Sequence, residues 1–300
     1  MASTASAASP DMPTLRLGIL PVLDTLPLFV ANDEGFFTEE GLSVELIPFN
    51  SALERDAALK GGSLDGYFGD LLNTILLNSS GEDLRIIATS YHTHPQHRMF
   101  ALLASPKSGI TSIQEAKNVP VAISIASIIE YLLEEIMTRE GIASEDIKKL
   151  EMRMIPIRYQ MLIGNSIKLA LLPEPLASKA VVEGAIPIAD DRKLDTTLTI
   201  LAVKETHLTG NRTLLPRFLR AYSKSVTLIN NNPLRFMDTI INKTRFPVSL
   251  KESFVMPTLP APVPPSRADV ARVVDWLLQR NLIPGQIPYE EIVWSGTKRE

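Results

Sequence analysis

Residues 15–42, LRLGILPVLDTLPLFVANDEGFFTEEGL, decide the fold of this chain. The first six are mostly apolar, which is typical of a strand that is covered on both faces. After them, Asp24 or Thr25 can cap a helix. The apolar side chains of that helix recur three and four positions apart, at Leu26, Phe29 and Val30. Gly35 ends the helix, so the stretch predicts a buried strand, a short turn and a helix.

The turn at Asp24 and Thr25 has a predicted place in the fold. A helix that begins just after the carboxyl end of a parallel strand has free N–H groups that point into the crevice at that edge of the sheet. Open α/β sheets hold their ligands in such crevices. We therefore expect this turn to face a ligand site.

Strands and helices continue to alternate along the chain. The further strands that we expect are 42–49, 64–70, 84–89, 98–104, 119–124, 151–157, 167–172 and 194–203. Alternation at these short intervals indicates an α/β protein with mostly parallel sheets and right-handed crossovers. The remainder is expected to be helical, apart from the proline-rich segment 246–265. That segment is expected to be an ordered strap over the lobe that contains the amino-terminal strands, rather than a flexible linker.

An internal repeat indicates two similar lobes. The order Glu-Gly-Leu, strand, helix, Gly, short strand, acid occurs at 40–70, and a similar order with Glu-Gly-Ile occurs at 140–174. The repeat places Asp70 and Glu174 at equivalent strand ends. Two such lobes facing each other form a clamp that closes on a ligand by hinge motion. The alternative, equally open from the sequence, is that both acids are helix caps or surface charges.

The composition excludes several classes of protein. The net charge is −4, and no Lys/Arg cluster occurs beyond the short tail at 298–299, which argues against a nucleic-acid partner. The chain has no cysteine, so disulfides, thiolate metal sites and thiol catalysis are excluded. No stretch approaches the roughly 20 apolar residues of a membrane span.

Residues 1–13 are small and polar, and we expect a disordered tail. They lack the basic and apolar regions of a secretion signal. Two interpretations are open: an exported protein whose signal is absent from this sequence, or a cytosolic protein with a simple tail.

Several motifs together resemble a known family. They are Gly-Ile-Leu-Pro at 18–21, Glu-Gly-Phe-Phe at 34–37, Glu-Gly-Leu-Ser-Val-Glu at 40–45, Gly-Gly-Ser-Leu-Asp-Gly at 61–66 and Leu-Leu-Pro-Glu-Pro-Leu at 171–176. With them the chain resembles the nitrate/taurine-type (NMT1/THI5-like) periplasmic substrate-binding proteins of ABC importers over most of residues 14–295. These are grouped with thiamine-pyrimidine-synthesis proteins.

The resemblance implies an architecture, partners and a location. The expected fold is the two-lobed periplasmic-binding-protein type II fold, with a ligand cleft between lobes that are each a mostly parallel sheet flanked by helices. Lobe 1 would comprise 14–93 and 203–300, and lobe 2 would comprise 94–202. The expected partners are a small-molecule ligand and an ABC permease in the membrane. The protein would be a monomer without a cofactor, periplasmic or anchored on the outer side of the membrane, and not an enzyme.

The candidate ligand-binding residues lie at predicted strand ends and helix starts. They are Asp24 and Thr25 at the first turn, Ser124 and Ser127 at the equivalent turn of lobe 2, the aromatic residues Tyr67 and Tyr91, and the acids Asp70 and Glu174. Aromatic faces can stack on a planar ligand, and carboxylates can accept hydrogen bonds from an amine or ring N–H. Because strand side chains alternate, only one of Tyr67 and Phe68 can face the cleft.

The second turn departs from the family pattern. In the family this turn is often rich in glycine and serine, whereas here it is Ser-Ile-Ala-Ser-Ile at 124–128. The lack of glycine favours an organic ligand with apolar surface over a small, strongly hydrated anion. A pyrimidine or other heterocycle is the first candidate, followed by a sulfonate or an aromatic carboxylate.

Three histidines form a separate cluster, at His92, His94 and His97. Imidazole is the commonest metal ligand, so a metal-binding receptor is one alternative. A metal site needs further ligands and supporting hydrogen bonds, and the sequence shows none nearby. We therefore expect polar hinge residues near the cleft, with His92 as a further candidate ligand contact.

The other alternative is an enzyme on the same fold, such as a lyase of the menaquinone-biosynthesis type. The sequence contains no Gly-x-Ser-x-Gly, no Walker-type phosphate loop and no His-Glu-x-x-His. The iron-binding, cysteine-rich segment of the thiamine-pyrimidine synthases is absent too. The receptor is therefore the leading hypothesis.

Overall fold

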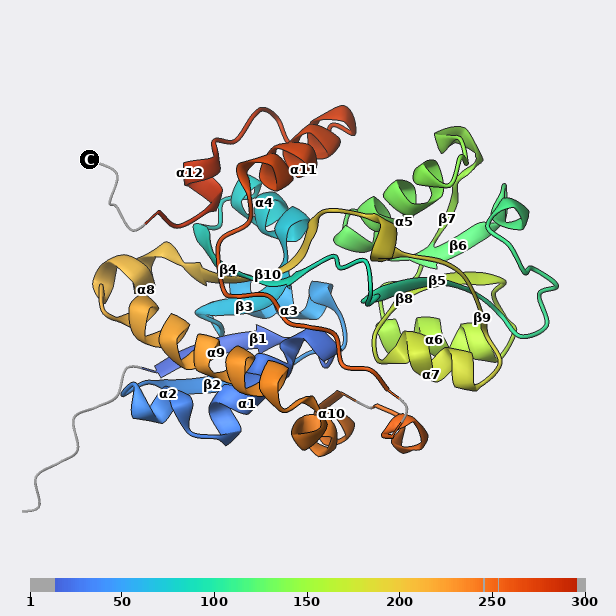
Figure 1. Ribbon diagram of the computed structural model, residues 1–300. Helices are drawn as coiled ribbons and strands as arrows, with labels where there is room; N and C mark the ends of the chain where they lie inside the picture. The colour runs from blue at the N-terminus through green and yellow to red at the C-terminus, as the bar shows by residue number, and fades with distance from the viewer. Residues whose placement is uncertain (1–13, 245, 253, 296–300) are drawn as a thin grey trace, which may run out of the picture.

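The structure is a computed structural model that describes residues 14–244, 246–252 and 254–295. The tail predicted at 1–13 lies outside these residues. Figure 1 shows two groups of strands side by side, each flanked by helices. We use "first lobe" for the sheet that contains the amino-terminal strand and the helices packed on it, and "second lobe" for the other sheet and its helices.

The first sheet has the strand order β2-β1-β3-β10-β4. Its members are β1 (Thr14–Ile19), β2 (Ser43–Pro48), β3 (Gly66–Asp70), β4 (Leu84–His92) and β10 (Thr197–Lys204). β1 is parallel to β2 and β3, whereas β10 is antiparallel to both of its neighbours, β3 and β4. Strand β1 is flanked on both sides, and its side chains Leu15, Leu17 and Ile19 are buried as the apolar run predicts.

The second sheet repeats this arrangement in the order β7-β6-β8-β5-β9. Its members are β5 (Phe100–Ala104), β6 (Pro120–Ile123), β7 (Lys148–Glu151), β8 (Leu169–Pro173) and β9 (Ile186–Asp190). Here β5 is the antiparallel strand, between β8 and β9. Position for position, β3 corresponds to β8. The sequence-based expectation of two mostly parallel α/β sheets is therefore confirmed, and so is the equivalence of the strand ends at Asp70 and Glu174.

Helices cover both sheets. They are α1 (Leu26–Asp33), α2 (Phe36–Glu39), α3 (Ala52–Lys60), α4 (Leu71–Ser79), α5 (Ile128–Arg139), α6 (Ile155–Ile163), α7 (Leu176–Val182), α8 (Glu205–Gly210), α9 (Leu214–Asn231), α10 (Met237–Thr244), α11 (Arg267–Gln279) and α12 (Tyr289–Ile292). The long helix α9 lies against α1 and α2, where the rings of Phe37 and Phe218 stack at 5.2 Å. Among the described residues, no helix combines the length and the apolar composition of a membrane span.

One predicted strand is wrong. The strand expected at 151–157 ends at Glu151, and α6 begins at Ile155. Pro156 occupies the first turn of α6, where a missing N–H costs nothing, so the chain continues as a helix.

Two crossing segments connect the sheets, residues 93–99 after β4 and residues 191–196 before β10. They are hydrogen-bonded to each other: Thr93 N donates to Thr196 O at 3.0 Å, Thr196 N donates to Thr93 Oγ1 at 3.0 Å, and Thr93 Oγ1 donates to Leu194 O at 2.9 Å. Since β10 already pairs within the first sheet, the second crossing precedes Thr197. The lobe boundary expected at 202/203 would fall inside this strand.

The proline-rich segment runs over the first lobe along β4, the edge strand (Figure 1). Thr89 N donates to Val263 O at 2.7 Å, and the side chain of Asn230 exchanges two hydrogen bonds with the backbone of Leu259. The segment therefore covers part of this sheet edge, as the expected strap would, and Trp294 N, which donates to Ile86 O at 3.0 Å, covers another part.

Two glycines make room for a buried cation at the end of the first sheet. A Cβ on Gly18 would lie 2.8 Å from Arg55 Cγ, and one on Gly69 would lie 2.1 Å from Tyr67 Cε2. The guanidinium carbon of Arg55 lies 4.2 Å from the centre of the Tyr67 ring. Small residues on two adjacent strands thus allow Arg55 and Tyr67 to stack beneath the sheet's carboxyl end.

We predict that Gly69→Ala lowers the free energy of unfolding by about 1–3 kcal/mol, because the added methyl group overlaps the immobile Tyr67 ring. Urea denaturation of the purified protein measures the change. Gly285→Ala is the matched control, because nothing lies within 4 Å of its Cβ position. Equal stability of Gly69→Ala and the wild type would contradict the packing described here.

Candidate functional site

A cavity of about 70 Å³ lies between the two lobes, at the carboxyl ends of their strands. Leu20 follows β1, Asp70 ends β3, Ser124 follows β6 and Pro173 ends β8, and all four line the cavity. This is the position that the parallel-sheet argument predicts for a ligand.

The lobes are close together in this structure. The cavity is much smaller than the roughly 300–1,000 Å³ that is typical of small-molecule sites. Leu23 N in the first lobe donates to Glu174 O in the second at 3.1 Å. Farther along the interface, Trp276 Nε1 of α11 donates to Glu134 Oε2 of α5 at 2.7 Å. A ligand of ordinary size therefore fits only when the lobes separate.

The cavity wall is largely apolar. Leu20, Val22 and Phe68 contribute from the first lobe, and Phe100, Ile128 and Ile155 contribute from the second. Such a wall favours a ligand with a substantial apolar surface.

Asp24 is the first polar group in this wall. It lies in the 3₁₀ turn Leu23–Thr25 and is only 1% exposed. Its Oδ2 accepts a hydrogen bond from Thr199 Oγ1 at 2.6 Å. Burial raises its pKa to about 6, although the hydrogen bond from Thr199 opposes the increase. The carboxyl group is thus ionised at neutral pH at a cost in free energy, which a hydrogen-bond donor on a ligand would reduce.

Asp70 is the second carboxyl group. It caps α4, where its Oδ1 accepts from Asn73 N at 2.7 Å. Burial again raises its pKa to about 6, against the opposing effects of that hydrogen bond and of the Arg55 charge. Both interpretations weighed from the sequence therefore apply to this residue: it is a helix cap and it lines the cavity.

Arg55 lines the cavity but is already fully engaged. It is 1% exposed, and Nη1 donates to Phe68 O at 2.8 Å. Nε and Nη2 both donate to Asp56 Oδ1, at 3.0 and 2.7 Å. Its charge is thus neutralised by Asp56 next to it.

The turn before α5 supplies two hydroxyl groups. Ser127 Oγ accepts from Ile129 N at 3.2 Å and donates to Ser124 O at 2.6 Å. Ser124 Oγ accepts from Arg158 Nη2 at 2.6 Å. Ala126 between them has φ +54°, a left-handed conformation that favours glycine. The turn therefore has the backbone conformation that glycine favours, although no glycine is present.

The structure brings four of the predicted residues to the cavity: Asp24, Asp70, Ser124 and Ser127. Thr25, Tyr67, Tyr91, His92 and Glu174 are not part of its lining.

Thr25 and Tyr67 have structural partners instead. Thr25 Oγ1 donates to Val22 O at 2.6 Å, within its own turn. The hydroxyl of Tyr67 lies 2.6 Å from Thr74 Oγ1, and its ring packs under Arg55. Phe68, the next residue, lines the cavity. Strand side chains therefore alternate as expected, but Phe68 rather than Tyr67 faces the cavity.

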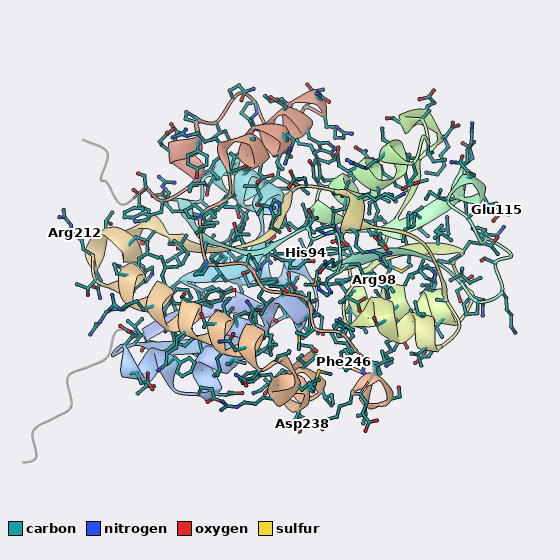
Figure 2. The ribbon with its side chains drawn as sticks, in the orientation of Figure 1. His94, Arg98, Glu115, Arg212, Asp238 and Phe246 are labelled. Carbon is teal, nitrogen blue, oxygen red and sulfur yellow. The ribbon has the colours of Figure 1, made fainter. Side chains whose placement is uncertain are left out.

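Tyr91 and Glu174 hold the crossing region. Tyr91 donates to His97 O at 3.1 Å. Glu174 Oε1 accepts from Arg98 Nε at 2.9 Å and from Ser178 Oγ at 2.9 Å. Figure 2 shows Arg98 between the two lobes, near His94. Both predicted contacts thus serve to join structural elements in this structure.

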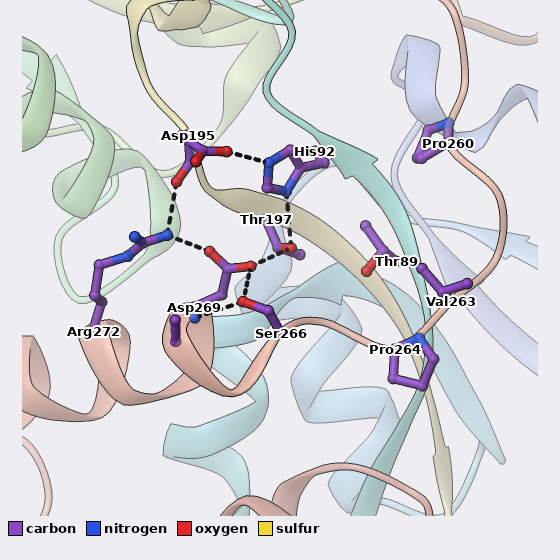
Figure 3. Close-up of a pocket in the computed structure, with 11 residues that line it drawn as sticks. Thr89, His92, Asp195, Thr197, Pro260, Val263, Pro264, Ser266, Asp269 and Arg272 are labelled. Carbon is purple, nitrogen blue, oxygen red and sulfur yellow. Dashed lines mark hydrogen bonds and ion pairs between the residues drawn. The ribbon is translucent and has the colours of Figure 1, made fainter.

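His92 lies in a different hollow, a groove of about 540 Å³ beside the crossing segments (Figure 3). Its Nε2 lies 2.9 Å from Asp195 Oδ1 and its Nδ1 lies 3.2 Å from Thr197 Oγ1. His94 and His97 instead stack on each other at 5.2 Å. Within the described residues, no group of three or more His, Asp or Glu side chains could hold a metal ion. The metal-receptor alternative therefore finds no site in this part of the chain.

The sequence did not single out several lining residues, notably Arg55, Arg153 and Thr199. Gly69, two residues after Tyr67, is the sequence feature that could have indicated that the Tyr67 ring is packed inside the lobe. Phe68 would then be expected to face the cavity.

Comparison with known proteins agrees with this geometry. The family model described as NMT1/THI5 like matches residues 23–235. No curated protein matches the chain.

Solved structures resemble the chain over nearly its whole length. The alkanesulfonate-binding protein SsuA from Xanthomonas axonopodis pv. citri, bound to MOPS, is 17% identical with a TM-score of 0.81, over 96% of this chain and 99% of that one. The aliphatic sulphonate binding protein SsuA from Escherichia coli is 18% identical with a TM-score of 0.77, over 97% and 94%. The desulfurization enzyme DszB is 13% identical with a TM-score of 0.69, over 94% and 96%. At these identities the likeness establishes the expected periplasmic-binding-protein fold.

We predict that Asp70→Asn stabilises the protein at neutral pH. The folded-state pKa of about 6 exceeds the usual 3.8. The free energy of unfolding of the wild type therefore decreases as the pH rises from about 4 to about 6, and it remains at the lower value above pH 6. Asparagine caps a helix as well as aspartate and carries no charge. The expected gain at pH 7.5 is up to about 3 kcal/mol, with little gain near pH 4.

Urea denaturation across this pH range measures the effect. Asp33→Asn, at an exposed position of α1, is the control. Identical pH dependence of Asp70→Asn and the wild type would show that Asp70 is not the source of this titration.

Proposed function

The chain belongs to the NMT1/THI5-like family, and we propose that it is the extracytoplasmic substrate-binding protein of an ABC importer. It binds one small organic molecule between its lobes, closes on it and delivers it to a membrane permease. The observation that carries this proposal is the cavity between the lobes, lined from both sides at the carboxyl ends of their strands.

Closure follows from contacts with both lobes. A ligand shifts the equilibrium towards the closed form only by the interactions that it gains there. Asp24, Asp70 and Thr199 contribute from one side, and Ser124 and Ser127 contribute from the other. The paired segments at Thr93 and Thr196 are the natural hinge, because hinges are few residues at element ends that absorb the backbone change.

The ligand that we propose is a heterocycle with amine or ring N–H donors, such as a pyrimidine precursor of thiamine. Two buried carboxyl groups with a pKa of about 6 favour hydrogen-bond donors over anions. The apolar wall suits the faces of a ring. A sulfonate is the competing ligand class, since the SsuA structures are of sulfonate-binding proteins, one of them bound to MOPS.

An enzyme on the same fold is the second candidate function. Carboxyl groups that titrate near neutrality in a closed cavity suit proton transfer, and DszB is named as an enzyme. Incubation of the protein with a bound metabolite separates the two functions. Unchanged recovery of the metabolite supports a receptor, whereas conversion to product supports an enzyme.

We predict that the purified protein binds an aminopyrimidine and that the separation of its lobes changes when it does so. Native mass spectrometry detects the complex, and small-angle X-ray scattering measures the radius of gyration with and without it. Asp24→Asn is expected to weaken binding by about ten- to hundredfold, because a charge-assisted hydrogen bond contributes about 1.5–3 kcal/mol. Asp33→Asn is the control and should bind like the wild type. Unaltered affinity of Asp24→Asn would exclude this carboxylate as a ligand contact.

The pH dependence of binding distinguishes the two ligand classes. A ligand that donates to Asp24 and Asp70 should bind about tenfold more weakly at pH 5 than at pH 7.5 for each carboxylate that it needs, because both groups become protonated below about pH 6. A sulfonate should bind more tightly at the lower pH, since two negative charges disappear. Isothermal titration calorimetry at both pH values provides the measurement.

A further inference from the structure

The second-lobe side of the cavity has two guanidinium groups and a backbone N–H donor close together. The backbone N–H of Ile125 lies in the turn before α5, between the lining residues Ser124 and Ser127. Arg153 lines the cavity itself, and its side chain is 46% exposed. Arg158 lies behind Ser124, fully buried, with Nη2 donating to Ser124 Oγ at 2.6 Å. A helix N-terminal turn flanked by two guanidinium groups would ordinarily attract an anion.

One carboxylate neutralises this cluster. Glu151, the last residue of β7, accepts from Ile125 N through Oε2 at 2.7 Å. Its Oε1 forms an ion pair with Arg153 Nε. It also acts on Arg158: burial lowers the pKa of that guanidinium to about 10, and the charge of Glu151 opposes the decrease.

The charge of Glu151 offsets part of the effect of burial on the Arg158 guanidinium. Its hydrogen bonds go to uncharged acceptors, which are Ser124 Oγ, Met152 O and Leu171 O. A buried cation with neutral partners keeps a positive potential around it. Glu151, at the end of β7, is the carboxylate whose charge acts on this guanidinium.

The other guanidinium group of the cavity wall and a further N–H donor of the turn before α5 also have acidic partners. Arg55 is paired with Asp56, and the N–H of Ala126 donates to Glu130 Oε2 at 2.6 Å. The carboxyl groups of Asp24 and Asp70 have no cationic partner at comparable distance among the hydrogen bonds of the described residues.

We propose that Glu151 determines the charge specificity of the cavity: by occupying the Ile125 N–H and the Arg153 guanidinium, it excludes ligands with an anionic group at the second lobe. This inference rests on the proposed receptor function and narrows its ligands to neutral or cationic molecules. Without Glu151, the same turn, Arg153 and Arg158 would form an anion site.

The test is a gain of binding. Glu151 is on the surface, with its side chain 37% exposed, so Glu151→Ala should fold. We expect the wild type to show no heat with MOPS or sulfate in calorimetry, and Glu151→Ala to bind MOPS about tenfold more tightly or better. Glu151→Gln, which keeps an acceptor for Ile125 N but loses the charge, should gain less. Glu145→Ala, an exposed acid of the same lobe, should behave like the wild type.

A second variant separates charge specificity from mere loosening of the turn. Glu151→Ala/Arg153→Ala should lose most of the gained affinity, because the freed guanidinium is then absent. Micromolar binding of MOPS by the wild type would overturn the proposal, and so would equal binding by the wild type and Glu151→Ala, or an unreduced gain in the double variant.

These outcomes are distinct from a failure of the proposed function. If the wild type binds no organic molecule but Glu151→Ala gains MOPS binding, the assignment of Glu151 stands and the receptor for a heterocycle fails. If the wild type binds an aminopyrimidine and Glu151→Ala gains nothing, the receptor stands and the role of Glu151 fails.

Discussion

The structure depends on the way the two sheets are joined. Two crossing segments connect them, and Thr93 on one is tied by its backbone and its hydroxyl group to Leu194 and Thr196 on the other. Because these hydrogen bonds join the two segments to each other, the connection between the sheets is a pair of bonded segments rather than two independent linkers. The carboxyl ends of the strands remain directed towards the same gap, and the helices that follow them carry the polar residues there.

The charge of the cavity depends on the partners of the ionisable side chains that line it. Each guanidinium that lines it has an acidic partner close by, Asp56 for Arg55 and Glu151 for Arg153. The two buried aspartates have hydroxyl or backbone partners in place of cations, and burial raises the pKa of each to about 6. The low dielectric of a closed gap amplifies this imbalance. A receptor with the same backbone could therefore change its preferred charge through one or two side chains, which fits the variety of ligands on this fold.

Much of the fold could be predicted from the sequence, because strand and helix signals are local. The strand, turn and helix at 15–35 and the equivalence of Asp70 and Glu174 were found in this way. The site could be predicted only in part. Asp24, Asp70, Ser124 and Ser127 lie where a strand ends or a helix begins, so local patterns were enough. Whether Tyr67 or Phe68 faces the gap depends on Gly69 and on Arg55 from another element, and the position of Thr199 depends on a strand that arrives after the whole second lobe.

That late strand has a consequence for how the chain folds. In the first sheet β10 is inserted between β3 and β4, so this sheet cannot be completed without residues 197–204, which follow the whole second sheet in the chain. The five strands of the second sheet, in contrast, are contiguous and end at Asp190. The second sheet can therefore form from one continuous stretch of chain, whereas the first keeps an open position between β3 and β4 until a strand that follows the whole second lobe is inserted.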